Sequence, residues 1–233
     1  LTMKKFLLSA VALFTVALSV NADDTWDWPN YRRYAAQNAE LMQNVPEDPR
    51  RVVFFGNSIT EGWARIKPEF FKKNDFVGRG ISGQTTYQFL LRFREDAINL
   101  KPALIVLNAA TNDIAENTCT YNEERTLQNI ISMAEMAQAN GIKIILTSVL
   151  PAAKFGWRTS ITDSSEKIQS LNARIKQYAE QNDIPYVDYY AELVHGENKA
   201  LNPAYSTDGV HPTAEGYDVM EKTILPVVRK YVP

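Results

Sequence analysis

Short apolar runs alternate along this chain with longer segments in which apolar residues recur every three to four positions. The runs lie at residues 52–55, 76–79, 104–107, 142–149 and 184–190, each bounded by glycine, proline or asparagine. Apolar strands separated by amphipathic helices indicate a parallel sheet that is covered by helices on both faces. The 233 residues suffice for a sizeable core and contain no linker or repeat. The sequence therefore predicts one α/β domain.

Four segments follow the 3.6-residue spacing of an amphipathic helix. We expect helices over residues 87–99, 123–139, 165–181 and 213–231, the last interrupted or bent at Pro226. We expect residues 23–49 to form an N-terminal helix whose aromatic side chains pack on the domain. The alternative is that these side chains line a substrate cleft. The aromatic residues are Trp26, Trp28, Tyr31 and Tyr34.

The first 22 residues have the pattern of an export signal. Lys4 and Lys5 precede an apolar stretch at residues 6–20, and Val20 and Ala22 occupy the positions that a signal peptidase reads. The stretch is shorter than the roughly 20 residues that span a bilayer, which argues against the alternative of a membrane anchor. We therefore expect a signal peptide at residues 1–22 and a single mature domain at 23–233. The mature protein is expected in the periplasm or outside the cell, without stable membrane insertion.

The charge balance disfavours nucleic acid as a partner. The chain has 25 basic and 27 acidic residues, and without Lys4 and Lys5 its net charge is −4. Nucleic-acid-binding proteins carry a basic stripe, and the sequence contains none. Cys119 is the only cysteine, so no disulfide within the chain is expected. Because its neighbours offer no base, we interpret Cys119 as a packed or loop residue rather than a nucleophile.

Three candidate catalytic residues follow the first three predicted strands. In an open parallel sheet, ligands bind beyond the carboxyl ends of the strands. Ser58 follows the first strand, and its surroundings fit either an exposed nucleophile or a helix N-cap. Gly83 follows the second strand and either brings a backbone N–H to a substrate oxygen or forms a turn. Asn112 follows the third strand and either donates to an oxyanion or caps a loop.

Asp208 and His211 lie three residues apart near the carboxyl end of the chain. One loop can hold both, so that the acid orients the imidazole. The chain has two histidines, and a neutral base near pH 7 must be one of them. His195 lies in a polar stretch without a motif, and we interpret it as a surface residue. His211 is therefore the candidate base.

Four segments together resemble the conserved blocks of the SGNH, or GDSL-like, hydrolases in their order along the chain. They are GNSIT at residues 56–60, GISG at 80–83, ATND at 110–113 and DGVHP at 208–212. The resemblance extends from about residue 51 to residue 217. It implies a three-layer α/β/α sandwich of flavodoxin-like type with a five-stranded parallel sheet. It also implies a serine esterase that needs neither a metal nor an organic cofactor.

The resemblance implies a role for each matching position. Ser58 matches the nucleophile, and Asp208 and His211 match its acid and base. The N–H groups of Ser58 and Gly83 and the side chain of Asn112 match the oxyanion hole.

Two positions depart from the family pattern. Asn57 stands where an acid usually precedes the nucleophile, and Ala110 stands where a glycine usually precedes the TND of the third block. Neither departure removes a catalytic group.

The expected reaction is hydrolysis of short acyl esters, acetyl esters above all, on carbohydrate. Four residues are expected in loops, where they either face a sugar ring or pack: Trp63, Phe155, Trp157 and Arg158. One alternative is a lysophospholipase or thioesterase, which would need a long apolar groove for its acyl chain. A further alternative, from a different class of protein, is a catalytically silent glycan-binding module. Such a module has no need for an intact set of nucleophile, base and acid. The sequence makes no prediction about the oligomeric state.

Overall fold

In the computed structural model, which describes residues 27–43 and 50–232, the five apolar runs form one parallel sheet. The strands lie side by side in the order β2-β1-β3-β4-β5. The predicted α/β fold with a five-stranded parallel sheet is thus confirmed. The strands are β1 (Val52–Gly56), β2 (Phe76–Gly80), β3 (Leu104–Asn108), β4 (Lys143–Thr147) and β5 (Tyr186–Val187).

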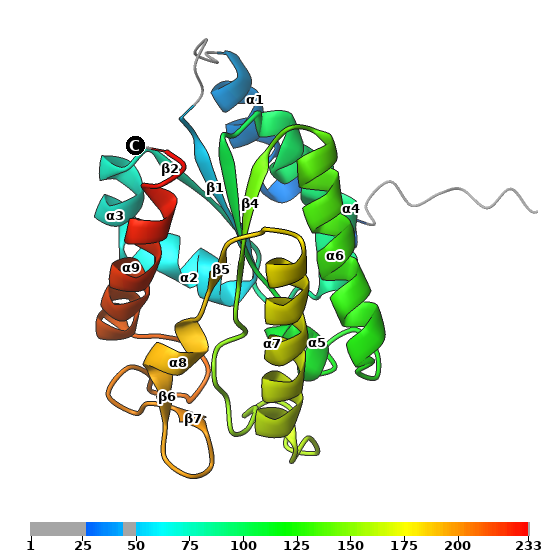
Figure 1. Cartoon of the computed structure of the whole chain (residues 1–233), viewed down its shortest axis with the longest axis vertical. Helices are drawn as coiled ribbons and strands as arrows, with labels where there is room; N and C mark the ends of the chain where they lie inside the picture. Colours follow the sequence, from blue (N-terminus) through cyan, green and yellow to red (C-terminus); the bar gives the residue numbers. More distant parts are fainter. Residues whose placement is uncertain (1–26, 44–49, 233) are drawn as a thin grey trace, which may run out of the picture.

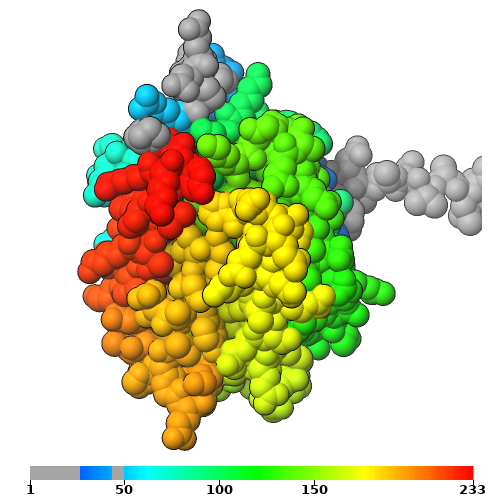
Figure 2. All heavy atoms as spheres, viewed as in Figure 1, coloured from blue at the N-terminus to red at the C-terminus, as the bar shows by residue number. Residues whose placement is uncertain are grey.

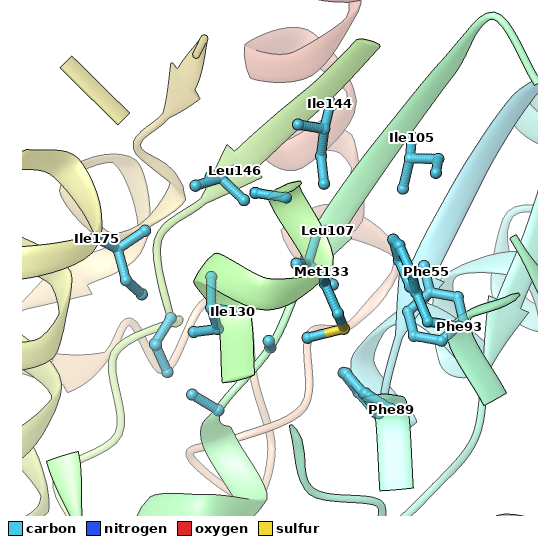
Figure 3. Packing of buried hydrophobic residues seen from close by; sticks show 14 of the residues in the cluster. Phe55, Phe89, Phe93, Ile105, Leu107, Ile130, Met133, Ile144, Leu146 and Ile175 are labelled. Atoms are coloured by element: carbon cyan, nitrogen blue, oxygen red, sulfur yellow. The ribbon is translucent and has the colours of Figure 1, made fainter. Parts of the chain in front are cut away.

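Helices cover both faces of the sheet, because successive residues of each strand point to opposite sides and both sides are apolar. Figure 1 shows α6 and α7 on one side and α2, α3 and α9 on the other. On the first side, Phe55 of β1 meets the rings of Phe89 and Phe93 edge-on, with centroids 5.2 and 5.1 Å apart (Figure 3). The helices of the first side are α4 (Thr86–Asp96), α6 (Glu123–Ala139) and α7 (Ser164–Gln181), and those of the second are α2 (Ser58–Ile66), α3 (Pro68–Lys73), α8 (Tyr189–Leu193) and α9 (Ala214–Val228).

The register aligns the carboxyl ends of three strands. Gly56 of β1 pairs with Gly80 of β2 and with Asn108 of β3. The segments that continue from these strands therefore leave the same edge of the sheet. Strand order also changes direction between β1 and β3, and this is the switch point at which open α/β sheets bind ligands.

The fifth strand is shorter than predicted. Residues 184–190 were expected to be extended, but β5 spans only Tyr186–Val187. The carboxylate of Asp188 accepts a hydrogen bond from the Ala191 N–H at 3.0 Å and so caps α8, which turns the chain into a helix. The last helix was expected to be interrupted or bent at Pro226; α9 continues past Pro226 to Val228, so the interruption is wrong and the bend stays a prediction.

The predicted N-terminal helix is found in part. The described residues form a 3₁₀ turn, η1 (Tyr31–Arg33), and α1 (Ala35–Gln43). Tyr34 between them is buried, and its hydroxyl donates to the Gly80 carbonyl at 2.5 Å. Trp26 and the leader predicted at residues 1–22 lie outside the described residues, so the leader and the domain boundary at residue 23 stay predictions.

Four small elements complete the described part of the chain: η2 (Ile98–Leu100), α5 (Thr111–Ile114), β6 (Val194–His195) and β7 (Ala200–Leu201). The last two pair as an antiparallel hairpin, and Figure 2 shows this segment projecting at one end of the molecule. His195 is exposed on this hairpin, as expected of a surface residue. Cys119 is exposed in the irregular segment after α5. No helix in residues 27–43 or 50–232 is long and apolar enough to cross a membrane.

Candidate active site

Ser58 is the first residue of α2, directly after the turn that leaves β1. The N-cap of this helix is Asn57, whose side-chain oxygen accepts from the Ile59 N–H at 3.0 Å. The interpretation of Ser58 as the N-cap is therefore wrong, and its hydroxyl is available for another partner. That partner is His211, whose Nε2 lies 2.8 Å from the Ser58 Oγ.

The loop before α9 holds His211 and Asp208 in contact. The His211 Nδ1 lies 2.7 Å from one carboxylate oxygen of Asp208. The other oxygen accepts from the backbone N–H groups of Val210 and His211, at 2.9 and 2.8 Å. Desolvation alone would raise the pKa of Asp208, but the hydrogen bonds from the His211 N–H, the His211 ring and the Val210 N–H outweigh it and lower the pKa to about 2. Asp208 is therefore a carboxylate at any pH near neutrality.

Asn112 and the segment around Gly83, which were expected to supply oxyanion donors, are joined to each other by hydrogen bonds. The Asn112 amide donates one N–H to the Gln84 carbonyl at 2.9 Å, which leaves its second N–H for another acceptor. Gly83 has a φ of 78°, a left-handed conformation that an L side chain rarely adopts. A Cβ at this position would meet nothing within 4 Å, so the requirement for glycine comes from the backbone and not from space.

Asn117 fixes the orientation of the Asn112 side chain. Its Nδ2 donates to the Asn112 Oδ1 at 3.1 Å and to the Gly83 carbonyl at 3.2 Å. An acceptor role for the Asn112 oxygen defines which end of the amide carries the N–H groups. Sequence reasoning missed Asn117, because it lies in an irregular segment where periodicity gives no signal.

Glu61 connects α2, which begins at Ser58, to the segment after β2. It lies one turn after Ser58 on α2, and one of its carboxylate oxygens accepts from the N–H and the hydroxyl of Ser82, at 2.9 and 2.5 Å. Arg33 of the N-terminal segment pairs with the other oxygen at 2.8 Å. Helical spacing from Ser58 could have identified Glu61 in the sequence, since residues three apart share a face.

A fully buried arginine lies beneath these segments. Arg92 of α4 donates to the carbonyl of Gly56 at the end of β1 and to the carbonyl of Arg79 in β2, at 2.9 and 3.1 Å. Its Nε donates to the side chain of Gln84 at 2.6 Å, and Asp96 compensates its charge at 3.1 Å. One guanidinium thus holds the ends of two strands and the segment beside Gly83 in fixed relation.

A pocket of about 890 Å³ opens beside Ser58 and His211. The N-terminal segment forms one wall, and α2 and the end of β2 form others. Its polar lining, apart from Ser58, His211 and Asp208, consists of Arg33, Gln37, Glu61, Arg65, Arg79 and Ser82, with Tyr34 and Tyr217 beside them. Tyr34 thus both packs and lines the pocket, so the two interpretations of the N-terminal aromatic residues hold together for this side chain.

Of the four residues that we expected to face either a sugar or the core, two are buried. Trp63 is 2% exposed and stacks on Phe70 and Tyr217, and Phe155 is completely buried. Trp157 is 45% exposed, and its ring centroid lies 6.2 Å from that of His211. Its indole N–H donates to the Asn117 Oδ1 at 2.9 Å. Arg158 is exposed and donates to the Glu116 carbonyl at 3.3 Å.

The two departures from the family pattern have local consequences. Ala110 is buried with a φ of 80°, a conformation in which a side chain adds strain and which explains the preference for glycine. Asn57 is completely buried, and its Nδ2 has no hydrogen-bond partner among the described residues. Its oxygen keeps the capping role that an acid would also perform.

The geometry fits nucleophilic catalysis. A serine hydroxyl in contact with an imidazole, which is itself oriented by a carboxylate, can attack an acyl carbon while the imidazole takes its proton. In the described ranges 27–43 and 50–232, no three His, Cys, Asp or Glu side chains are arranged to hold a metal ion.

The sequence profile of the GDSL-like Lipase/Acylhydrolase family matches residues 54–219. The chain belongs to this family. As a GDSL esterase or acylhydrolase, it is a hydrolase that acts on ester bonds. The resemblance seen in the four sequence blocks is thereby confirmed.

Three proteins illustrate the similarity of this GDSL-family chain to known relatives. The crystal structure of a GDSL-like lipase from Bacteroides thetaiotaomicron VPI-5482 is 63% identical, with a TM-score of 0.86 over 88% of this chain and 99% of that one. The uncharacterized lipoprotein YqeF of Bacillus subtilis is 32% identical over 211 residues, covering 74% of this chain and 87% of that protein. An acetylxylan esterase of Xylanibacter ruminicola is 24% identical over 244 residues, covering 87% of this chain but 48% of that esterase, about half of its length.

Proposed function

We propose that the chain is a serine esterase that removes short acyl groups, acetyl above all, from carbohydrate through an acyl-enzyme. The observation that carries the proposal is the pair of contacts from the Ser58 Oγ to the His211 Nε2 at 2.8 Å and from the His211 Nδ1 to Asp208 at 2.7 Å. These distances are within hydrogen-bond reach, which proton transfer requires.

In this mechanism His211 takes the Ser58 proton as the Oγ attacks the acyl carbon. The N–H groups of Ser58 and Gly83 and the free N–H of Asn112 stabilise the oxyanion. The intermediate collapses when His211 gives its proton to the alcohol oxygen, and the alcohol leaves. A water molecule, deprotonated by His211, then attacks the acyl-serine, and the acid departs with Ser58 restored. Asp208 stabilises the imidazolium in both steps.

The lining of the pocket offers groups that can bind a carbohydrate alcohol. Charged and amide side chains such as Arg33, Gln37 and Arg65 lie beside the apolar side chains of Ala64, Ile66 and Pro212, and the polar groups can bind sugar hydroxyls. The exposed ring of Trp157 beside His211 offers a flat apolar surface to a sugar ring. The name of the distant acetylxylan esterase is consistent with this substrate class.

Export is part of the proposal. The basic and apolar pattern of residues 4–22 supports it, and a relative bears the name lipoprotein. An exported enzyme would meet acylated glycans outside the cytoplasm.

The test is hydrolysis of p-nitrophenyl esters from acetate to palmitate by the protein and by Ser58→Ala. We expect activity that depends on Ser58 and peaks at acetate. A peak at long chains would move the substrate to lipids, as in the lysophospholipase alternative. Covalent labelling by a fluorophosphonate tests the binding-module alternative, because a silent site does not react. Asn112→Ala should lower turnover by about 100- to 1000-fold, as loss of one oxyanion donor does.

A further inference from the structure

One face of α2 carries both the nucleophile and a cation. Ser58, Glu61, Gly62 and Arg65 all line the 890 Å³ pocket. Their spacing of three, four and seven residues places them on one side of the helix. Arg65 lies about 10 Å along the helix axis from Ser58, at 1.5 Å per residue. Because side chains lean toward the N-terminus of their helix, the guanidinium of Arg65 extends back toward the nucleophile.

The carboxylates of the pocket are already engaged. Glu61 pairs with Arg33 at 2.8 Å and accepts from Ser82. Asp208 pairs with His211. No carboxylate therefore remains in the lining to neutralise a further cation.

Two arginines of the lining have no acidic partner. Among the described residues, neither Arg65 nor Arg79 forms an ion pair. Arg79 is 5% exposed, and it donates to Asn38 and to the Gly78 carbonyl, while its Nη2 has no hydrogen-bond partner in the described part of the chain. Arg79 feels the charge of Asp96 without contacting it, and Asp96 itself pairs with Arg92, so the cations on this wall outnumber the carboxylates near them. Arg65, which is exposed, has its donors free for a ligand.

We propose that this pocket binds a carboxylate on the alcohol part of the substrate, with Arg65 as the contacting group, so that the preferred ester is an acylated acidic sugar. The inference rests on the proposed esterase function and names its substrate class. A guanidinium presents a planar fork of donors that matches a carboxylate, which makes arginine the residue suited to this recognition. A hydrogen bond between charged groups corresponds to a preference of about 10- to 100-fold.

The test compares two substrates that differ only in the carboxylate. They are the methyl glycosides of glucuronic acid and of glucose, each with one acetyl group on the same hydroxyl, and acetate release gives kcat/KM for each. We expect the wild type to favour the uronate by about 10- to 100-fold, and Arg65→Gln to bring this ratio close to one. Arg94→Gln is the matched control, because Arg94 is exposed on α4 outside the pocket lining, and it should keep the wild-type ratio.

A ratio near one in the wild type, or an unchanged ratio in Arg65→Gln, would overturn the inference. Ser58-dependent hydrolysis of p-nitrophenyl acetate alongside either result would leave the esterase proposal standing. Calorimetric binding of methyl glucuronoside provides a readout that needs no turnover. Binding about 10-fold weaker in Arg65→Gln than in the wild type supports the inference, and equal affinity of the wild type for the uronate and the neutral glycoside contradicts it.

Discussion

Replacing Asp208 with asparagine should disable His211 as a base through its tautomer. One oxygen of Asp208 accepts two backbone N–H groups, from Val210 and His211, and the other faces the His211 Nδ1. If the asparagine oxygen keeps the two backbone bonds, its NH₂ faces Nδ1, which must then be an acceptor. The ring proton moves to Nε2, and Nε2 can no longer take the proton of Ser58.

The expected loss in kcat follows from the free energy needed to turn the asparagine amide into its other orientation. To restore the productive tautomer, the asparagine must turn its NH₂ toward the two backbone N–H groups, which leaves both without an acceptor. The two hydrogen bonds are exposed or part-buried, so each one lost costs about 0.5 to 1.5 kcal/mol, and the productive arrangement lies about 1 to 3 kcal/mol higher. At 1.36 kcal/mol per factor of ten, we expect Asp208→Asn to lower kcat by about 5- to 150-fold.

The assay is the initial rate of p-nitrophenyl acetate hydrolysis, with thermal unfolding to verify that the fold persists. Asp163→Asn is the control, because Asp163 is a half-exposed carboxylate that pairs with Lys167 at 2.8 Å and does not line the pocket beside Ser58, and its loss should not change the rate. An Asp208→Asn enzyme that is folded and retains more than a third of the wild-type rate would refute the tautomer argument.

Three further predictions concern residues around the site. Asn117→Ala should lower kcat about 10-fold with little change in KM, because Asn112 loses the partner that orients its amide. Steady-state kinetics, which separate kcat from KM, provide the measurement. Ala110→Val should lower the free energy of unfolding by about 2 kcal/mol or more, since a β-branched residue tolerates the φ of 80° poorly, whereas Ala110→Gly should stay within about 1 kcal/mol of the wild type. Burial raises the pKa of Asp113 from 3.8 to about 6, so its contribution to stability is full below about pH 4 and is lost as the pH rises through 6. Relative to Asp113→Asn, the wild type should lose up to about 3 kcal/mol between pH 4 and pH 7 in urea unfolding.

Each of these predictions has an outcome that contradicts it. A raised KM with unchanged kcat in Asn117→Ala would place that residue in substrate binding. Equal unfolding temperatures for the valine and glycine variants at residue 110 would remove the strain argument. Parallel stability curves for the wild type and Asp113→Asn would show that Asp113 titrates as an ordinary carboxyl group.

The sheet and the strand-end residues were predictable because they depend on local patterns. Apolar runs separated by amphipathic segments define the parallel sheet, and aligned strand ends then bring the segments of Ser58, Gly83 and Asn112 to one edge. The length of β5 was not predictable from its apolar run, because the hydrogen bond that the Ala191 N–H donates to the Asp188 carboxylate begins α8 and ends the strand early.

The aromatic residues illustrate where sequence reasoning fails. Trp63 lies five residues after Ser58 on α2, which places it about 140° away around the helix and toward the core. The helix therefore explains its burial, whereas a loop interpretation does not. Phe155 and Trp157 lie two residues apart in an irregular segment, and only the tertiary fold decides that one is buried and the other exposed.

Part of the pocket wall comes from the N-terminal segment, which the family profile does not match. The family profile begins at residue 54, yet Arg33, Tyr34 and Gln37 form a wall of the pocket beside Ser58. The wall of this pocket is thus encoded partly inside and partly ahead of the stretch that the family profile matches. A substitution at residue 33, 34 or 37 would change this wall and leave the four sequence blocks intact. Two chains that share every block can therefore present different surfaces to an alcohol.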